Sequence, residues 1–235
     1  MSAHFHSYLC GRIAAEWLID MKNLIFIGGT MGVGKTTVGQ ILKNKLDHSV
    51  FLDGDWCWDS SPFIVTEETK AMVIDNIAYL LNSFLDCTEY KNIIFVWVMH
   101  EQSVIDRLIS MLGKRKYRFF NFSLVCSPEV LRKRLEADVA VGKRTADIIE
   151  RSIPRLPLYD KIQSTRINTD DLSAEETARQ IADKVNSEHN ACPCKRAKCK
   201  RHGDCIACRA HHMTKKHSPV ACERRKGNEK SHTEK

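Results

Sequence analysis

The sequence lacks the features that would place it in or across a membrane. None of its apolar runs reaches the roughly 18 residues that a transmembrane helix needs. Residues 1–20 lack a basic start followed by an apolar stretch and a small-residue cleavage site, so they do not match a secretory signal. We therefore expect no membrane partner and no secretion.

Residues 1–190 also have little net charge, with 23 basic and 25 acidic side chains, whereas residues 191–235 carry 13 basic and four acidic ones. Cysteine follows the same division, since six of the ten lie between Cys192 and Cys222. Such a change in composition marks a boundary. We expect one domain over residues 21–190 and a basic, Cys/His-rich tail over residues 191–235. We assign no function to residues 1–20, and Met21 is an alternative starting residue of the protein.

One stretch matches a phosphate-binding pattern. Residues 29–36 fit G-x-x-x-x-G-K-[ST], after an apolar run and before a helical pattern. Glycines let backbone N–H groups turn toward phosphate oxygens, and the helix N-terminus favours an anion. Lys35 is placed to bridge the terminal phosphates of ATP, and the Thr36 hydroxyl to ligate Mg²⁺. The predicted nucleotide contacts of the loop are Gly29, Gly32, Val33, Gly34, Lys35, Thr36 and Thr37.

The rest of this domain alternates between two kinds of pattern. Short apolar runs predict strands at 23–27, 49–53, 92–99, 119–126 and 163–168. Helical patterns lie at 35–46, 67–86, 101–112, 127–140, 145–153 and 173–187, and the last begins with a capping box of Ser173 and Glu176. This alternation predicts an α/β three-layer sandwich around a five-stranded parallel sheet. An ATP-binding body with scattered cysteines also favours the reducing cytoplasm.

Ligands of such folds gather at the carboxyl ends of the strands, and two acidic sites follow strands there. Asp53-Gly-Asp55 ends the second strand, so one carboxylate can hold Mg²⁺ through water while the other takes a proton from an acceptor hydroxyl. An ordinary Asp-Gly turn is the alternative. After the third strand, either Glu101 replaces the usual Walker B aspartate and His100 contacts substrate, or Glu101 caps a helix and His100 is a bystander.

These motifs together resemble a known group. Residues 21–187 look like the small P-loop kinases of metabolites, namely shikimate kinase, gluconate kinase and adenylylsulfate kinase. The resemblance rests on the loop at 29–36, on Phe51-Leu-Asp-Gly-Asp55, on a basic segment after the fourth strand, and on Ile167-Asn-Thr169 before Leu172-Ser173. It implies a P-loop NTPase fold with a mobile lid, in which Asp53 assists the metal and Asp55 contacts the acceptor.

The resemblance also assigns roles to basic residues from 127 to 151. Arg134 best fits the lid arginine that stacks on adenine, and Arg144 and Arg151 are candidates to meet the transferring phosphoryl group. Such cations stabilise charge on the equatorial oxygens during transfer. The alternative is a solvated helix face held by pairs four residues apart.

Two departures concern the acceptor. The Gly-rich turn after the third strand of shikimate kinase is absent, and so is the arginine that follows the Leu-Asp-Gly-Asp motif in adenylylsulfate kinase. Residues 51–101 contain no arginine, only Lys70 and Lys91, against nine acidic residues. Because anionic acceptors normally need a guanidinium, we expect a neutral or cationic one. Trp56 and Trp58 either form an apolar wall for it, or one is core and the other a surface neighbour.

The tail has the composition of a small metal-binding module. In a reducing compartment its cysteines are read as ligands of zinc or of an iron–sulfur cluster rather than as disulfides. Cys205-x-x-Cys208 is a familiar half of a zinc site, and a disordered basic tail is the alternative. The predicted ligands are Cys192, Cys194, Cys199, Cys205, Cys208 and Cys222.

Two functions therefore remain open. The first is an ATP- and Mg²⁺-dependent phosphotransferase acting on a hydroxyl of a small molecule, with Lys35, Asp55, Arg144 and Arg151 as catalytic residues. The second is an ATP-driven nucleic-acid-binding protein or polynucleotide 5′-hydroxyl kinase that uses the basic tail.

Overall fold

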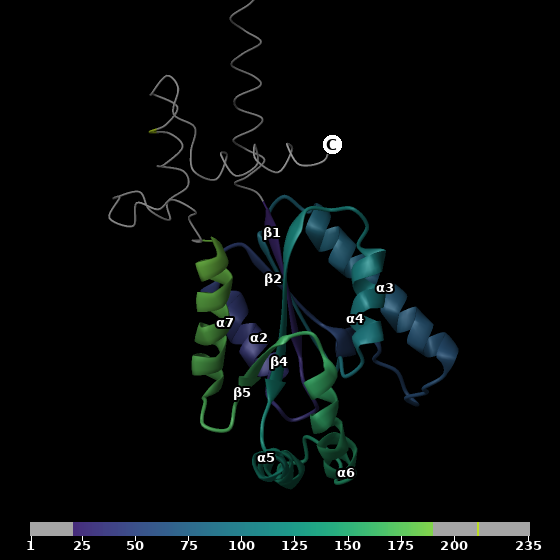
Figure 1. Ribbon diagram of the computed structural model, residues 1–235. Coiled ribbons are helices and arrows are strands. Elements are labelled where there is room, and N and C mark those ends of the chain that lie inside the picture. The colour runs from purple at the N-terminus through teal and green to yellow at the C-terminus, as the bar shows by residue number, and fades with distance from the viewer. Residues whose placement is uncertain (1–20, 190–210, 212–235) are drawn as a thin grey trace, which may run out of the picture. The chain divides into compact units, whose positions relative to one another are not determined.

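The computed structural model describes residues 21–189 and residue 211 (Figure 1). The expectations for residues 1–20, and for the six tail cysteines as metal ligands, therefore lie outside the described residues. Internal contacts divide the chain into two units, Met1–Ala182 and Asp183–Lys235, and every strand described here belongs to the first.

A parallel sheet forms the centre of the first unit. Its strands are β1 (Lys22–Gly28), β2 (Ser49–Asp53), β3 (Asn92–Trp97), β4 (Tyr117–Val125) and β5 (Thr165–Asn168). Their order is β2-β3-β1-β4-β5, and all neighbours are parallel. Each connection leaves from the carboxyl end of one strand and returns to the amino end of another, so helices must cover both faces. The five-stranded parallel sheet predicted from the sequence is confirmed.

The helices supply the two outer layers. They are α2 (Lys35–Lys45), α3 (Glu67–Asp86), α4 (Gln102–Met111), α5 (Pro128–Ala140), α6 (Ile148–Ser152) and α7 (Ala174–His189), with 3₁₀ turns η1 (Gly54–Cys57) and η2 (Ile153–Lys161). Figure 1 shows α2 and the start of α7 on one face and α3 and α4 on the other. Among the described helices, none is long and apolar enough to cross a membrane.

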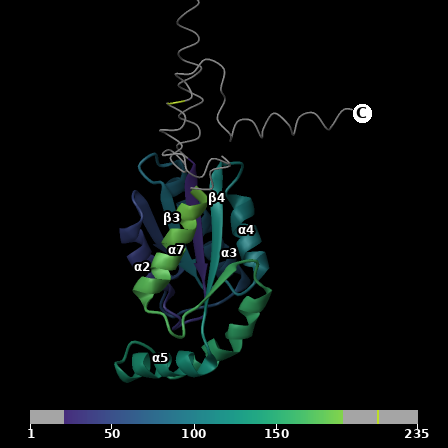
Figure 2. The same cartoon turned by 60° about the vertical axis from the view of Figure 1, so that its left-hand side comes forward.

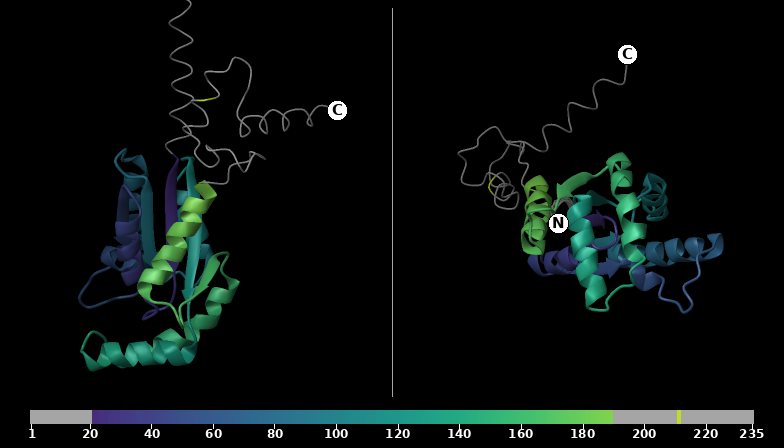
Figure 3. Two further views of the ribbon diagram at one scale, coloured as in Figure 1. Left: turned by 90° about the vertical axis from the view of Figure 1, so that its left-hand side faces the viewer. Right: turned by 90° about the horizontal axis from the view of Figure 1, so that it is seen from below.

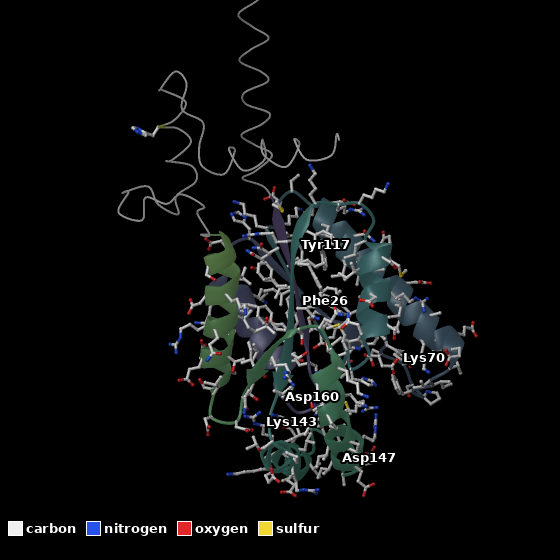
Figure 4. All side chains as sticks on the ribbon, viewed as in Figure 1. Phe26, Lys70, Tyr117, Lys143, Asp147 and Asp160 are labelled. Carbon is white, nitrogen blue, oxygen red and sulfur yellow. The ribbon has the colours of Figure 1, made fainter. Side chains whose placement is uncertain are left out.

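The core follows from the two-residue alternation of strand side chains. Leu24 and Phe26 face the α3–α4 layer and pack with Ile77, Leu81 and Leu108 in one fully buried cluster (Figure 4). The intervening residues of β1 face the opposite layer and are equally buried. This two-sided burial explains why the strands read as continuous apolar runs rather than as alternating ones.

The α-helix predicted over 145–153 is shorter than expected, and a 3₁₀ helix follows it. The α-helix covers Ile148–Ser152, and the chain continues as the 3₁₀ turn η2. Pro154 and Pro157 lack the backbone N–H that an α-helix needs, so the helix cannot propagate through them. The fifth strand is also shorter than the predicted 163–168, because the Gln163 N–H bonds the Gln102 side chain instead of a neighbouring strand.

The third strand likewise stops before the predicted end at 99. The Met99 N–H donates to the Trp97 carbonyl at 3.1 Å, a tight turn that leaves the ladder and leads to His100. The remaining elements, α5 and α6, lie beyond the carboxyl ends of the strands (Figure 2). That end of the sheet carries the predicted site.

Close contact between α2 and the sheet depends on Gly39. A Cβ at this position would lie 2.5 Å from a Phe51 ring carbon and 2.8 Å from a Val96 methyl, closer than side chains tolerate. We expect Gly39→Ala to destabilise the fold by about 1–2 kcal/mol, since overpacking outweighs the gain of about 1 kcal/mol in helix propensity. Urea unfolding measures this, with Asn44→Ala on the exposed side of α2 as control. A Gly39→Ala protein as stable as the wild type would contradict the packing argument.

Candidate active site

The phosphate-binding loop connects β1 to α2 at the carboxyl edge of the sheet. Gly34 is the N-cap of α2, with a φ of 103°, a left-handed conformation that other residues rarely adopt. The first N–H groups of a helix have no partner within it, so those of Lys35, Thr36 and Thr37, the first residues of α2, are available to a ligand at the loop. Unpaired N–H groups and the helix dipole together favour a phosphate at this position.

Helix α5 packs against this loop, and the left view of Figure 3 shows it below the carboxyl ends of the strands. A Cβ at Gly32, whose φ is 83°, would lie 2.5 Å from a Leu135 methyl carbon. Leu131 and Leu135 are fully buried, and Met31 of the loop packs against the same cluster. A glycine at position 32 therefore serves both the turn of the loop and the contact with the lid.

Lys35 is the cation of the loop, and it is partly buried. Its ammonium donates to the Thr30 carbonyl at 3.0 Å. Burial lowers the pKa of Lys35 from 10.5 to about 8, while the carboxylates of Asp55 and Asp53 act in the opposite direction. A poorly solvated ammonium gains much from an anionic partner, which is what a nucleotide phosphate supplies.

Asp53 and Thr36, the two predicted magnesium ligands, lie together. The Thr36 hydroxyl donates to the Asp53 carboxylate at 2.7 Å, and the Asp55 N–H donates to the other carboxylate oxygen at 3.1 Å. Magnesium in kinases is held by one or two such oxygens, by water and by the nucleotide phosphates. This hard oxygen pair fits that ion. Within the described residues no group of three or more His, Cys, Asp or Glu side chains forms a protein-only metal site.

Asp55 follows on η1 and faces the same cluster. Partial burial, and then the negative charge of Asp53, raise the pKa of Asp55 above 3.8, while Lys35 and Arg144 oppose the shift. The Trp97 side chain also opposes the rise in the pKa of Asp55. The Trp97 ring lies against Gly54, where a Cβ would be 2.4 Å from it. The sequence offered no motif for Trp97, because it lies inside an apolar strand.

A pocket of about 190 Å³ opens beside the loop, lined by Gly34, Thr37, Arg134 and Leu172 among others. The Arg134 guanidinium donates to the Thr169 hydroxyl at 3.0 Å and to the Thr169 carbonyl at 2.6 Å. These bonds fix the guanidinium plane at the pocket wall. Arg134 therefore lines the pocket beside the loop, and its role in stacking on adenine stays a prediction.

The other two lid arginines differ in position. Arg144 pairs with Asp138 at 3.1 Å, and its charge acts on the pKa of both Lys35 and Asp55. Arg151 pairs with Asp147, one helical turn earlier, at 3.0 Å, and both side chains are more than half exposed. Figure 4 labels Lys143 and Asp147 at this end of the molecule. The structure thus brings Arg144 near the cluster and holds Arg151 in a surface pair.

The segment 152–159 contains residues that sequence reasoning missed. The Thr30 hydroxyl donates to the Ser152 carbonyl at 2.9 Å, and both residues are fully buried. Arg155 reaches Met31 of the loop, with 3.3 Å from its guanidinium to the sulfur, and the buried Tyr159 ring packs against Gly28. Local sequence patterns did not identify this segment, because Pro154 and Pro157 interrupt any helical or strand pattern.

The remaining predicted residues lie on the acceptor side. His100 Nε2 is 3.7 Å from the Glu101 carboxylate, and burial followed by the charge of Arg155 lowers the pKa of His100. Glu101 is the N-cap of α4, but its side chain makes no capping bond. Trp58 packs against the core, whereas Trp56 is 60% exposed.

A parallel sheet in this strand order, with a phosphate loop after β1 and acidic residues after β2, defines a P-loop protein with the fold of small kinases. Residues 25–153 match a family model described as "AAA domain" (AAA_18), more than half of the chain, and the protein belongs to that family. No curated protein matches the chain.

Solved structures share the fold at low sequence identity. The tunicamycin resistance protein of Deinococcus radiodurans is 23% identical, with a TM-score of 0.55 over 70% of this chain and 95% of its own. Shikimate kinase of Acinetobacter baumannii is 21% identical, with a TM-score of 0.50 over 72% and 94%. The APS kinase CysC of Mycobacterium tuberculosis is 17% identical, with a TM-score of 0.51 over 71% and 98%. The resemblance to small metabolite kinases is confirmed for residues 21–187.

The charge of the partly buried Lys35 should lower the stability of the nucleotide-free protein. Because the pKa of Lys35 is lower in the folded chain, the unfolded chain binds that proton more tightly, and stability should rise as pH increases from about 8 toward 10.5. At pH 7 we expect Lys35→Met to stabilise the nucleotide-free protein by about 1–2 kcal/mol while abolishing ATP binding. Urea unfolding with and without ATP measures both effects, with Lys43→Met on the same helix as control. Loss of stability in Lys35→Met would refute this account.

The bond from Thr30 to Ser152 should hold the loop to η2. Thr30→Val keeps the shape but removes the hydroxyl that donates to the buried Ser152 carbonyl. We expect a loss of about 1 kcal/mol of stability and severalfold weaker ATP binding, since a buried hydrogen bond contributes about that much. Thr30→Ser retains the hydroxyl and should behave like the wild type. Equal behaviour of the valine and serine variants in unfolding and in ATP titration would show that the bond contributes nothing.

Proposed function

We propose that the protein transfers the γ-phosphoryl group of ATP to a hydroxyl group of a small molecule. The observation that carries this proposal is the meeting of Lys35, the Thr36–Asp53 pair and Asp55 at one edge of the sheet, beside a pocket for the base. Phosphoryl transfer requires positioning and charge stabilisation, and this cluster supplies the groups for both.

In this proposal the loop N–H groups and Lys35 hold the β- and γ-phosphates, and Arg134 stacks on the base. Thr36 and Asp53 would hold Mg²⁺, which neutralises charge on the phosphates. The acceptor hydroxyl gives its proton to Asp55 while its oxygen bonds to the γ-phosphorus. The bond from that phosphorus to the bridging oxygen breaks, and ADP leaves with the electron pair. Arg144 would stabilise charge on the equatorial oxygens, and Arg151 would have to leave Asp147 to assist.

The acceptor is proposed to be neutral or cationic. The described segment 51–101 has no arginine, and Lys70 is paired with Glu67 at 2.9 Å. Although residues 51–101 have no arginine, Arg155 of η2 lies close to Met31 of the loop and acts on the pKa of His100. A guanidinium is therefore present at the carboxyl ends of the strands. An acceptor panel must therefore include a carboxylated sugar as well as neutral and cationic compounds.

The second function considered is ATP-driven nucleic-acid binding or phosphorylation of a polynucleotide 5′-hydroxyl. Its support is the basic composition of residues 191–235, which lie outside the described residues. The same panel tests it with a 5′-hydroxyl oligonucleotide. Deletion of 191–235 should abolish that activity and spare transfer to a small molecule.

The test is ³¹P-detected transfer from ATP with Asp55→Asn as the key variant. We expect Asp55→Asn to lower the transfer rate by at least about a hundredfold with ATP affinity nearly unchanged, since general bases contribute roughly 10²–10⁴-fold. Asp59→Asn, an exposed carboxylate four residues further on, is the matched control. Wild-type transfer should rise with pH as Asp55 loses its proton, from a midpoint above 3.8 because its pKa is raised. Unchanged transfer by Asp55→Asn would remove Asp55 as the base, and ATP hydrolysis without any phosphorylated product would refute the phosphotransferase.

A further inference from the structure

A run of exposed apolar side chains follows the acidic pair. Phe63, Ile64 and Val65 are 57%, 53% and 54% exposed, and they are consecutive in the chain. We call these three residues the 63–65 shelf. Single exposed apolar residues are ordinary, but three in succession at the edge of a candidate site indicate an apolar contact surface.

The backbone around the shelf is held in place. The Phe63 ring lies 4.8 Å from the Trp58 ring, and Trp58 packs against the core. The Ile64 carbonyl accepts a hydrogen bond of 3.0 Å from the Thr69 hydroxyl, and Thr66 and Thr69 form the capping box that starts α3. The shelf is thus anchored at both ends while its side chains stay exposed.

The shelf is also continuous with the acceptor side of the site. The Trp58 N–H donates to the Asp55 carbonyl at 3.2 Å, so the tryptophan that supports Phe63 is bonded to the residue proposed as the base. Trp97, on the neighbouring strand β3, packs against Gly54 next to Asp55. The Trp58 ring therefore links the shelf to the turn that carries Asp55, with Asp59, Ser60 and Ser61 between them in the chain.

Charge restricts what the shelf can bind. Between Leu52 and Thr69 the chain has no lysine or arginine, whereas Asp59, Glu67 and Glu68 flank the shelf in sequence. The next cation, Lys70, is paired with Glu67 (Figure 4). An anionic portion of a ligand would be repelled here, and a sugar alone would leave the apolar surface in water.

We propose that the acceptor is amphiphilic: its hydroxyl meets Asp55, and an uncharged alkyl chain or fused-ring portion lies on the 63–65 shelf. The proposal deepens the proposed function and rests on it for the role of Asp55. The occupant is a portion of the acceptor rather than a second copy of this chain, because Trp58 joins the shelf to the turn that carries Asp55.

The test uses a homologous series of neutral probes on the full chain with saturating ATP and Mg²⁺. Methyl, butyl, hexyl and octyl β-D-glucoside, each below its micelle concentration, are titrated against tryptophan fluorescence. We expect the dissociation constant to fall by at least about threefold for every two methylenes, a part of the full transfer value since one side of the chain stays in water. No dependence on chain length would overturn the proposal.

Variants locate the effect. F63S/I64S should remove the chain-length dependence, whereas Tyr79→Ser, at an exposed aromatic side chain on α3, should leave it intact. Retention of the dependence in F63S/I64S overturns the proposal. Light scattering that shows self-association lost in F63S/I64S also overturns it, because the shelf would then be a contact between copies.

Asp55→Asn separates this inference from the proposed function. Its side chain is not part of the shelf, so chain-length-dependent binding should persist when transfer is lost. Chain-length-dependent binding with no phosphoryl transfer to any acceptor would refute the phosphotransferase alone. Transfer to short polar acceptors with no gain from an alkyl chain would refute the amphiphilic acceptor alone.

Discussion

The site depends on the charge of Lys35. Its ammonium is partly buried and donates a hydrogen bond to the Thr30 carbonyl. Burial lowers the pKa of Lys35 to about 8, so the folded chain is stabilised by any ligand that brings negative charge to the loop. The carboxylates of Asp55 and Asp53 act on the same charge and oppose that shift. The loop is therefore arranged for an anion before one binds, and this pre-organisation lowers the reorganisation that binding requires.

Neighbouring elements hold the loop in this arrangement. Leu135 of α5 packs against Gly32, and Tyr159 packs against Gly28. The Ser152 carbonyl accepts a hydrogen bond from the Thr30 hydroxyl. These contacts join the loop and the last residue of β1 to α5 and to the segment 152–159.

The acceptor side is built from different chemistry. The Trp58 N–H donates to the Asp55 carbonyl, and the Trp58 ring contacts Phe63 of the 63–65 shelf. Partial burial and the neighbouring charge of Asp53 raise the pKa of Asp55, whereas the Trp97 side chain acts against that rise. The polar phosphate side and the apolar acceptor side meet at the acidic pair.

The sequence by itself determined the sheet, the loop and the acidic pair, because these depend on local patterns: apolar runs, a glycine-rich spacing, and two aspartates after a strand. The sequence predicted that Thr36 and Asp53 both assist Mg²⁺, and in the fold the Thr36 hydroxyl lies 2.7 Å from an Asp53 carboxylate oxygen. Only the tertiary structure decided the rest. The 3₁₀ turn η2 interrupts the predicted pattern at two prolines, yet it delivers Arg155 and Tyr159 to the loop across more than a hundred residues of chain. Trp97 lies in an apolar strand, so the sequence pattern assigns it to the core. In the fold it lies near Asp55, because β3 is adjacent to β2 in the sheet. Contacts between residues far apart in the chain arise from packing and register, for which a local pattern carries no signal.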